Sequence, residues 1–214
     1  SEEDDFYAYG ISTDIISDCS SAGLIRVSGI KEVEELGNIS FKEKAKKLFV
    51  RYVATGSLWK MNNIFQLSIE LYDIKEKKIV WSDRWQEKWD ELPTIKMNLS
   101  DGLLKTLSAK RIIKHKKENF NPEAYEYYLK GRHKWKKSKN AEDIEIAKGL
   151  LLKSIELDNR LLISKNTLAW IEIYSSDITI AEKMFSENLK EAKESKNYEE
   201  MSAALNGLGC ISRD

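Results

Sequence analysis

The sequence predicts an α+β domain over about residues 1–115, a small mixed sheet with helices packed on it, followed by an all-α superhelix over 119–214. Three observations predict this. Small residues recur at Gly131, Ala169 and Gly209, spaced 38 and then 40 apart. Residues 64–72 alternate between apolar and polar side chains, the pattern of a strand with one wet face. Only 2 of the 214 residues are proline and 33% are charged, which suits long solvated helices.

The first expected element is a helix over 9–22, because apolar residues recur there at helical spacing. These residues are Ile11, Ile15, Ile16 and Cys19, with Ser12 and Thr13 as candidate caps. Residues 24–27 (LIRV) are short, β-branched and preceded by Gly23, so they predict a strand. Ser40 and Glu43 form a capping box, and the helix they open is expected to bury Phe41, Ala45 and Leu48.

Three strands and a helix follow. We expect a mostly buried strand over 51–59, then the alternating strand over 64–72, then an antiparallel strand over 79–85. A helix begins at Leu92-Pro93 and presents one apolar side, formed by Ile95, Leu99, Leu103 and Leu107.

One strand is missing from this order. A helix that leads directly into a strand usually implies an earlier strand beside it, and these residues supply none. We therefore expect either an exposed sheet edge or a first strand upstream of Ser1.

The second half repeats a helix pair. A second amphipathic block follows each of the first two small residues: Ala147, Leu151 and Ser154, then Ala181, Phe185 and Asn188. A single pair cannot bury its apolar face, so a repeat of this length predicts a stack of helix pairs. Such stacks mostly bind other proteins.

Several segments resemble, in order, a TolB-amino-terminal-like (FlgO-like) domain followed by tetratricopeptide repeats. They are residues 10–16 (GISTDII), 51–58 (RYVATGSL), 80–85 (VWSDRW) and 121–132 (NPEAYEYYLKGR). In the repeats, the second blocks match the small and large positions of a second helix. Residues 195–197 (SKN) and 203–209 (AALNGLG) resemble the junction and opening of a further repeat.

The chain also departs from that family. Asn159 stands where a closing proline is usual, Glu172 and Ser212 occupy usual tyrosine positions, and the third repeat stops after its first helix at Asp214. The acidic start at residues 1–5 and the shortened last repeat suggest the excised middle of a larger protein. The resemblance implies a regulatory region beside a class III adenylate or guanylate cyclase, a kinase or a winged-helix domain, with the cyclase preferred.

Composition limits the compartment and the ligands. The chain has 35 basic and 35 acidic residues, two cysteines, and no apolar run near the roughly 20 residues that span a bilayer. Cys19 and Cys210 read as reduced thiols, so we expect a cytoplasmic location, or a periplasmic one if the parent protein is exported. We expect no membrane insertion by this region.

Local charge is less even. Residues 105–139 hold 12 Lys or Arg against three Glu. This stretch is either a pair of solvated helix faces or a docking patch for an acidic partner. Nucleic acid is a less favoured partner because Trp135 is the only tryptophan there.

No constellation of catalytic or metal-binding residues is evident. The only histidines, His115 and His133, lie in the basic stretch, and with Cys19 and Cys210 they offer no paired zinc spacing. There is no nucleophile elbow and no glycine-rich phosphate loop. We therefore expect neither a cofactor nor catalysis in this region. The carboxylates Asp4, Asp5, Asp14 and Asp18 are expected on a solvated helix face.

Trp81, Trp85 and Trp89 recur every four residues, which puts them on one face of a strand. They either cover the sheet or form an aromatic floor for a ligand or a partner helix.

The expected function is protein interaction, through a partner segment or a second copy bound by the first helices of the repeats. The candidate positions are Tyr125, Tyr128, Arg132, Trp135, Asn166, Trp170 and Asn206. Two other functions remain open: a structural dimerisation spacer, and an accessory protein of the envelope or of flagellar assembly.

Overall fold

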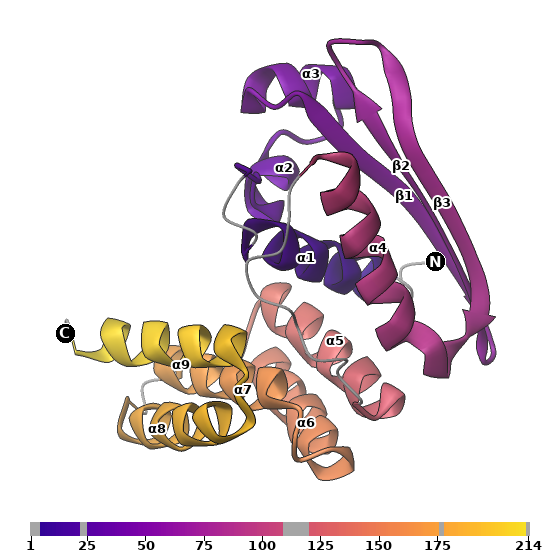
Figure 1. The fold of residues 1–214 in the computed structure, drawn as a ribbon. Coiled ribbons are helices and arrows are strands. Elements are labelled where there is room, and N and C mark those ends of the chain that lie inside the picture. Colours follow the sequence, from indigo (N-terminus) through magenta and orange to yellow (C-terminus); the bar gives the residue numbers. More distant parts are fainter. Residues whose placement is uncertain (1–4, 22–24, 109–119, 176–177, 213–214) are drawn as a thin grey trace. The chain divides into compact units, whose positions relative to one another are not determined.

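A computed structural model describes residues 5–21, 25–108, 120–175 and 178–212 (Figure 1). The chain divides into two compact units, Ser1–Glu118 and Asn119–Asp214. Unit 1 combines helices with a small sheet, so the α+β class is confirmed, whereas every described element of unit 2 is a helix. Residues 109–119 of the basic stretch over 105–139, with His115, lie outside the described residues, as do Leu24 and Asp4.

The sheet of unit 1 consists of β1 (Tyr52–Met61), β2 (Ile64–Asp73) and β3 (Lys78–Lys88). It has the order β1-β2-β3 and both pairings are antiparallel. The prediction of a mixed sheet is therefore wrong for the described residues. Asn62 and Asn63 make the tight turn between β1 and β2, and Asn62 takes a positive φ of 55°, as such two-residue turns require.

Helices α1 (Asp5–Ser21) and α4 (Leu92–Thr106) lie on the same face of this sheet (Figure 1). That face carries the alternating apolar residues of β2: Phe65, Leu67, Ile69 and Leu71 are all buried. Ile95, Leu99 and Leu103 of α4 are buried too, as predicted. The core of unit 1 is thus the layer between α4, α1 and the inner face of β2.

Two short helices, α2 (Ile30–Glu35) and α3 (Phe41–Leu48), precede β1. The predicted capping box is confirmed: the backbone N–H of Glu43 donates to Ser40 Oγ, and the N–H of Ser40 donates to Glu43 Oε2. Of the three residues expected to be buried in α3, Ala45 is buried and Leu48 half-buried, but Phe41 is 37% exposed. Its ring packs against Tyr72 at a centroid distance of 5.2 Å, which leaves its other side in solvent.

Three other predictions for unit 1 are wrong. Residues 25–27 belong to no strand, because the described residues place no strand beside them. β1 is largely exposed instead of buried, because it is an edge strand. Thr13 is not a cap: it lies inside α1, and its hydroxyl donates to the carbonyl oxygen of Gly10 at 2.7 Å.

The acidic face predicted for α1 is confirmed for Asp5, which is exposed, but is wrong for two other carboxylates. Asp14 and Asp18 are buried. Lys96 of α4 pairs with Asp14 at 3.0 Å, and the Ser100 hydroxyl donates to Asp18. These two carboxylates join α1 to α4.

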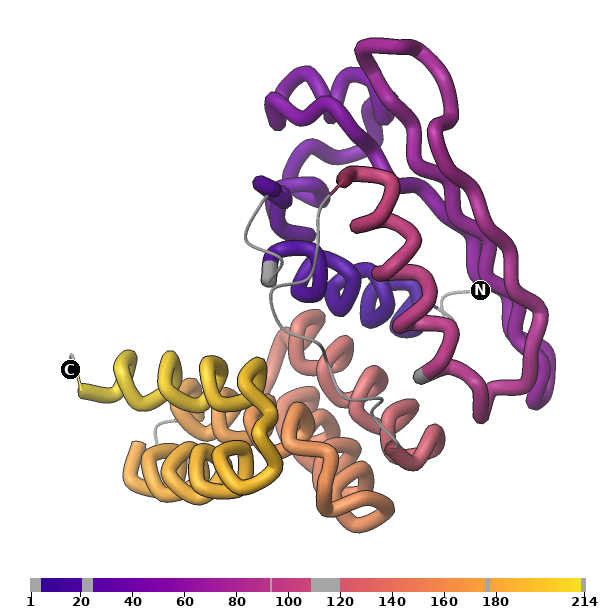
Figure 2. The backbone as a smooth tube through the Cα atoms, viewed as in Figure 1, coloured from indigo at the N-terminus to yellow at the C-terminus, as the bar shows by residue number. Residues whose placement is uncertain are grey.

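The backbone trace shows unit 2 as a series of adjacent helices (Figure 2). They are α5 (Pro122–Lys136), α6 (Ala141–Leu157), α7 (Leu162–Tyr174), α8 (Ile178–Ser195) and α9 (Tyr198–Ile211). α5 packs on α6, α6 on α7, α7 on α8, and α9 on both α8 and α7. The predicted second blocks are buried: Ala147, Leu151, Ser154, Ala181, Phe185 and Asn188.

The small residues differ in role. Gly131 approaches α6 so closely that an added Cβ would lie 2.9 Å from Leu151 Cγ, and Ala169 is fully buried. Gly209 is exposed, with nothing near an added Cβ. The close approach in α9 is made instead by Gly207, where a Cβ would lie 2.4 Å from the Phe185 ring. The predicted packing role of Gly209 is therefore wrong for the described residues, because this residue faces neither α7 nor α8.

Candidate functional sites

The seven residues predicted to bind a partner divide by exposure. Tyr125, Tyr128 and Asn166 are buried, whereas Arg132, Trp135 and Trp170 are half-buried and Asn206 is exposed. Partner binding by these positions stays a prediction. A partner could reach the half-buried and exposed side chains without any rearrangement of unit 2. These side chains are Arg132, Trp135, Trp170 and Asn206.

Tyr128 and Arg132 act together on α5. They lie one helical turn apart, and Arg132 Nη1 donates a hydrogen bond to the Tyr128 hydroxyl at 2.7 Å. The Tyr125 ring stacks on Phe120 with centroids 4.7 Å apart. These contacts fix both tyrosine rings, and they orient the guanidinium at the edge of the helix.

Asn166 lies in a buried polar cluster that joins three helices. Its Nδ2 donates to Glu200 Oε2 at 2.7 Å and to the Glu200 carbonyl oxygen at 3.2 Å. Its Oδ1 accepts from Asn188 Nδ2 at 2.9 Å. All three side chains are buried. Hydrogen bonds of this kind specify how helices dock, because an unpartnered buried amide is costly.

Aromatic pairs lie beside this cluster. The Trp170 ring meets the Phe185 ring edge-on at 5.5 Å, within the core of α7, α8 and α9. The Trp135 ring lies 5.9 Å from the ring of Tyr174 at the end of α7. Tyr174 is 70% exposed. Trp135 and Tyr174 thus join the ends of α5 and α7 in one accessible aromatic surface, which the sequence pattern did not indicate because Tyr174 lies outside the repeat positions.

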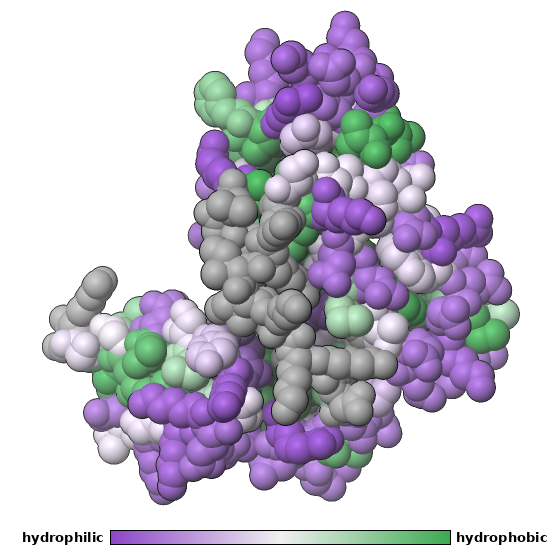
Figure 3. Space-filling view, viewed as in Figure 1, coloured by the Kyte–Doolittle hydropathy of each residue, from purple (hydrophilic) through white to green (hydrophobic). Residues whose placement is uncertain are grey.

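Unit 2 also exposes apolar side chains at the start of its fourth helix. Ile178 and Ile180, at the start of α8, are both exposed. In the space-filling view, hydrophobic side chains lie at the surface of unit 2 near its C-terminal end (Figure 3). We call Arg132, Trp135 and Tyr174 the aromatic surface of unit 2.

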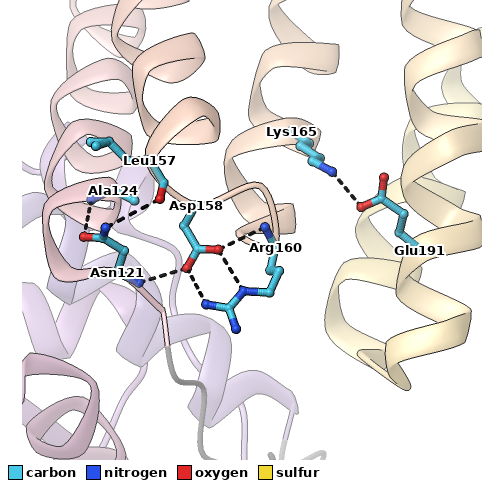
Figure 4. A network of polar contacts seen from close by, with 7 residues as sticks. All are labelled: Asn121, Ala124, Leu157, Asp158, Arg160, Lys165 and Glu191. Atoms are coloured by element: carbon cyan, nitrogen blue, oxygen red, sulfur yellow. Dashed lines mark hydrogen bonds and ion pairs between the residues drawn. The ribbon is translucent and has the colours of Figure 1, made fainter.

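A polar network holds the helix starts of unit 2 in place (Figure 4). The backbone N–H of Asn121 donates to Asp158 Oδ2 at 2.9 Å, and Asn121 Oδ1 in turn accepts from the N–H groups of Glu123 and Ala124. Arg160 donates to Asp158 from its backbone N–H and its guanidinium. Burial acts to raise the pKa of Asp158, but these hydrogen bonds outweigh it, so its pKa lies below the ordinary value. Nearby, Lys165 Nζ donates to Glu191 at 2.6 Å, joining α7 to α8.

Unit 1 contains a different feature, a hollow of about 590 Å³. Its walls come from α1, residues 25–30, α3, β1 and α4, and most of the lining side chains are apolar; examples are Ile11, Val27, Ala45, Leu58 and Leu103. Its volume is in the range of ligand sites. Among the described residues that line it, the charged side chains are the cations Arg26, Lys44 and Arg51.

Backbone and side-chain contacts fix the rim of this hollow near α3. Phe49 ends α3 in a left-handed conformation with φ 54°, and it is 87% exposed. Arg51 forms a two-pronged hydrogen bond with Asp73, whose carboxylate also accepts from the backbone N–H groups of Lys75 and Glu76. The Arg51 hydrogen bond, supported by those N–H groups, lowers the pKa of Asp73 to about 2.

The tryptophans of β3 cover the sheet. Trp81 and Trp85 stand opposite Leu71 and Leu67, on the inner face. Gly102 of α4 fits against Trp81 so closely that an added Cβ would lie 2.6 Å from its ring. Trp89 is in a short 3₁₀ turn (η2, Trp89–Glu91), not in the strand, and its buried ring contacts Tyr7 and Phe65. Packing therefore accounts for Trp81 and Trp89, whereas the half-buried Trp85 ring lies 6.4 Å from the Trp81 ring.

Within the described parts of the chain, no group of three or more His, Cys, Asp or Glu could hold a metal ion. Cys19 is buried and Cys210 exposed, and neither forms a disulfide. Over the same residues, no helix combines the length and the apolar character that crossing a bilayer demands.

Comparison with known proteins gives one informative similarity. No protein-family model matches the sequence. The chain is 21% identical over 183 residues to a protein of Rhizobium meliloti (strain 1021) that bears the name "Putative adenylate cyclase 3". The alignment covers 80% of this chain but only 30% of that relative. The chain is thus similar to a part of a much longer protein whose name is that of a signalling enzyme.

Proposed function

We propose that residues 1–214 form a non-catalytic regulatory and protein-interaction region of a larger bacterial signalling protein, a class III adenylate or guanylate cyclase. The observation that carries this proposal is the extent of the similarity. The alignment takes in both units of this chain, yet it leaves about 70% of the relative outside it. We place the cyclase chemistry in that remainder.

The structure supports an interaction role for unit 2. We propose that its helices form tetratricopeptide-like repeats, with α5–α6 and α7–α8 as the first two pairs and α9 as the start of a third. Gly131 and Ala169, 38 residues apart, each allow close packing in the first helix of a pair. We likewise propose that unit 1 is a TolB-amino-terminal-like domain, and that the whole region is cytoplasmic.

The partner would bind at the aromatic surface of unit 2. Aromatic and arginine side chains contribute most of the binding energy in many interfaces. Here Trp135, Tyr174 and Arg132 offer these side chains without the need to unfold a helix, and the bond to Tyr128 already orients Arg132. A partner segment with apolar and acidic residues would complement this surface.

A dimerisation spacer is the second candidate. The exposed side chains of Tyr174, Ile178 and Ile180 favour it, because exposed apolar side chains that gather on one surface often mark interfaces. Sedimentation of residues 1–214 over a concentration series separates the two. A monomer at all concentrations supports the partner, and a concentration-dependent dimer supports the spacer.

The direct test compares full-length protein with a form that lacks residues 119–214. We expect the deletion to change cyclase regulation or the oligomeric state, while nucleotide turnover itself persists. If both regulation and oligomeric state survive, unit 2 has no regulatory role. A finer version replaces Trp135 with Ala and uses Tyr198→Ala as a control, because Tyr198 is an exposed aromatic residue of α9 outside the aromatic surface.

An envelope or flagellar-assembly accessory role is the third possibility. It predicts an export signal in the parent protein and residence in the periplasm. Fractionation of cells that express the native protein decides between this role and the signalling role.

A further inference from the structure

One end of unit 1 carries a dense group of lysines. It is formed by α3 with the residues that follow it, 41–51, and by the turn between β2 and β3, residues 72–79 (Figure 1). The two segments hold eight cations against three carboxylates, although the whole chain has equal numbers of basic and acidic residues. We call these two segments the basic end of unit 1.

Side-chain contacts join the two segments into one surface. Arg51 Nη2 pairs with Asp73 Oδ2 at 2.7 Å and lies 4.0 Å from Glu76 Oε1. At the start of α3, the Phe41 ring contacts the Tyr72 ring edge-on, with centroids 5.2 Å apart. The lysines of α3 and those of the turn therefore lie at the same end of the sheet.

The carboxylates of the basic end have partners within it, whereas most of its lysines do not. Asp73 and Glu76 face Arg51, and Glu43 accepts hydrogen bonds from Ser40 at the start of α3. Six exposed lysines form no ion pair with another described residue: Lys42, Lys46, Lys47, Lys75, Lys77 and Lys78. Their charges are left for a partner of opposite charge.

An aromatic ring stands in solvent beside these lysines. Phe49 ends α3 with a φ of 54°, in the left-handed region that bulky side chains rarely adopt. Its backbone N–H donates to the carbonyl oxygens of Ala45 and Lys46, so the end of the helix holds this conformation. The ring is 87% exposed, and Ile79 in the other segment is 49% exposed. Each segment thus adds an exposed apolar side chain to its lysines.

We propose that the basic end of unit 1 docks on the surface of a membrane that contains anionic phospholipids. The lysines lie against the headgroups, and the Phe49 ring enters the boundary between headgroups and acyl chains. Basic clusters of this size on an amphipathic helix are typical of binding to anionic lipids, and phenylalanine beside them supplies the apolar contact. α3 alone has four lysines among its eight residues. Only side chains enter the lipid, so no helix has to span the bilayer.

The kind of cation favours lipid over nucleic acid or a phosphorylated protein. Arginine makes the two-pronged contacts that those partners favour, but Arg51, the one arginine in the two segments, already makes such a contact with Asp73. The other cations are lysines, which act as point charges and suit a layer of mobile headgroups. An exposed ring also stacks on nucleic-acid bases, so the test includes an oligonucleotide.

The test is co-sedimentation of residues 1–214 with lipid vesicles. One set of vesicles is phosphatidylcholine alone, and the other contains about a third phosphatidylserine. We expect binding to the anionic vesicles only, with most of it lost between about 0.1 M and about 1 M salt, because salt screens the attraction. Equal binding to both sets, or binding to neither, would overturn the proposal. So would tighter binding to a single-stranded oligonucleotide than to the anionic vesicles.

A pair of charge variants tests the role of the lysines. Each lysine near an anionic surface strengthens binding about fivefold, so Lys46→Gln combined with Lys47→Gln should weaken it about 20-fold. Lys190→Gln combined with Lys193→Gln is the control, because it removes the same charge from two exposed lysines of α8 in unit 2. The control should bind like wild type. Equal losses in the two pairs would show that net charge alone drives binding, and would contradict docking by the basic end.

Phe49→Gly separates the role of the ring from the stability of the fold. Glycine adopts a positive φ without strain, so the variant should melt no lower than wild type. Its binding to the anionic vesicles should fall about tenfold, because the apolar surface of the ring is lost. Trp59→Ala is the control: Trp59 is 50% exposed, but it lies near the β1–β2 turn, at the opposite end of the sheet. Wild-type binding by Phe49→Gly, or a loss with Trp59→Ala alone, would overturn the placement of the membrane contact.

Discussion

The backbone N–H of Asn121 donates to the carboxylate of Asp158 over 2.9 Å, across 37 residues of sequence. Asn121 caps α5, and Asp158 follows the end of α6. One carboxylate therefore holds the start of the first helix of unit 2 against the turn that leads into α7. This hydrogen bond therefore holds α5 and α6 together, in addition to the apolar core between them.

Replacing Asp158 with Ala should destabilise unit 2 by about 1–3 kcal/mol, because it leaves the Asn121 N–H and the Arg160 N–H without their buried acceptor. Thermal or urea unfolding measures the change. Glu156→Ala is the control: Glu156 lies two residues away and is exposed, so its loss should cost no more than about 0.5 kcal/mol. Equal effects of the two substitutions would show that Asp158 does not stabilise the first helix pair.

Asn166 and Asn188 should be energetically coupled. Each single replacement by Ala breaks the buried cluster with Glu200 and should cost about 1–3 kcal/mol. The double variant should cost less than the sum, because the second change removes a group that the first has already left unpartnered. A double-mutant cycle on urea unfolding measures the coupling. Strict additivity would contradict the cluster.

Two glycines of α9 should respond in opposite directions to Ala. Gly207→Ala should destabilise unit 2 by about 1–3 kcal/mol, because the new methyl group would overlap the Phe185 ring. Gly209→Ala adds its methyl group in open space and should stabilise the helix by about 0.5–1 kcal/mol. Melting temperatures of the two variants suffice as the readout. If Gly209→Ala is the damaging one, the packing of α9 described above is wrong.

Unit 1 should lose stability in acid through Asp73. The pKa of this carboxyl is lowered to about 2 in the folded chain, chiefly by its hydrogen bond to Arg51, whereas an unfolded Asp titrates near ~3.9. A depressed folded pKa contributes stability above the unfolded value, and this contribution is lost as pH falls from about 4 to about 2. The difference in unfolding free energy between wild type and Asp73→Asn should narrow over that window. A difference that stays constant would contradict the role of the Arg51–Asp73 pair, and Asp83→Asn on β3 is the control.

The sequence predicted those elements whose signal is local. The capping box of Ser40 and Glu43, the alternation in β2 and the apolar side of α4 each depend on residues a few positions apart, and all three are confirmed. Asp14 and Asp18 were assigned to solvent because their partners, Lys96 and Ser100, lie some 80 residues further along the chain. A local sequence pattern does not reveal a contact between residues so far apart in the chain.

The errors around β1 have one cause. Residues 24–27 and 51–59 have the composition of buried strands, and a helix that leads directly into a strand usually implies an earlier strand beside it. Among the described residues, no strand lies next to residues 25–28 or pairs with the outer edge of β1, and both segments border the hollow. The composition of these segments is suited to pairing with another strand on a buried sheet. No such strand is among the described residues, so one segment forms no strand and the other is an exposed edge.

The candidate interaction surface was predicted only in part. The repeat pattern located Arg132 and Trp135, because helical spacing identifies the first helix of each pair. It also selected Tyr125 and Asn166, which are buried, because spacing alone does not say which side of a helix its neighbours cover. Tyr174 emerged only from the ring contact with Trp135.

We propose that residues 1–214 belong to a larger cyclase, and the native protein provides the test. An antibody raised against residues 1–214 would recover it from cells, for determination of its mass and of its conversion of ATP to cyclic AMP. We expect a polypeptide well above the 24.7 kDa of this chain, with cyclase activity that residues 1–214 alone do not show. A native protein of 24.7 kDa without activity would contradict the account.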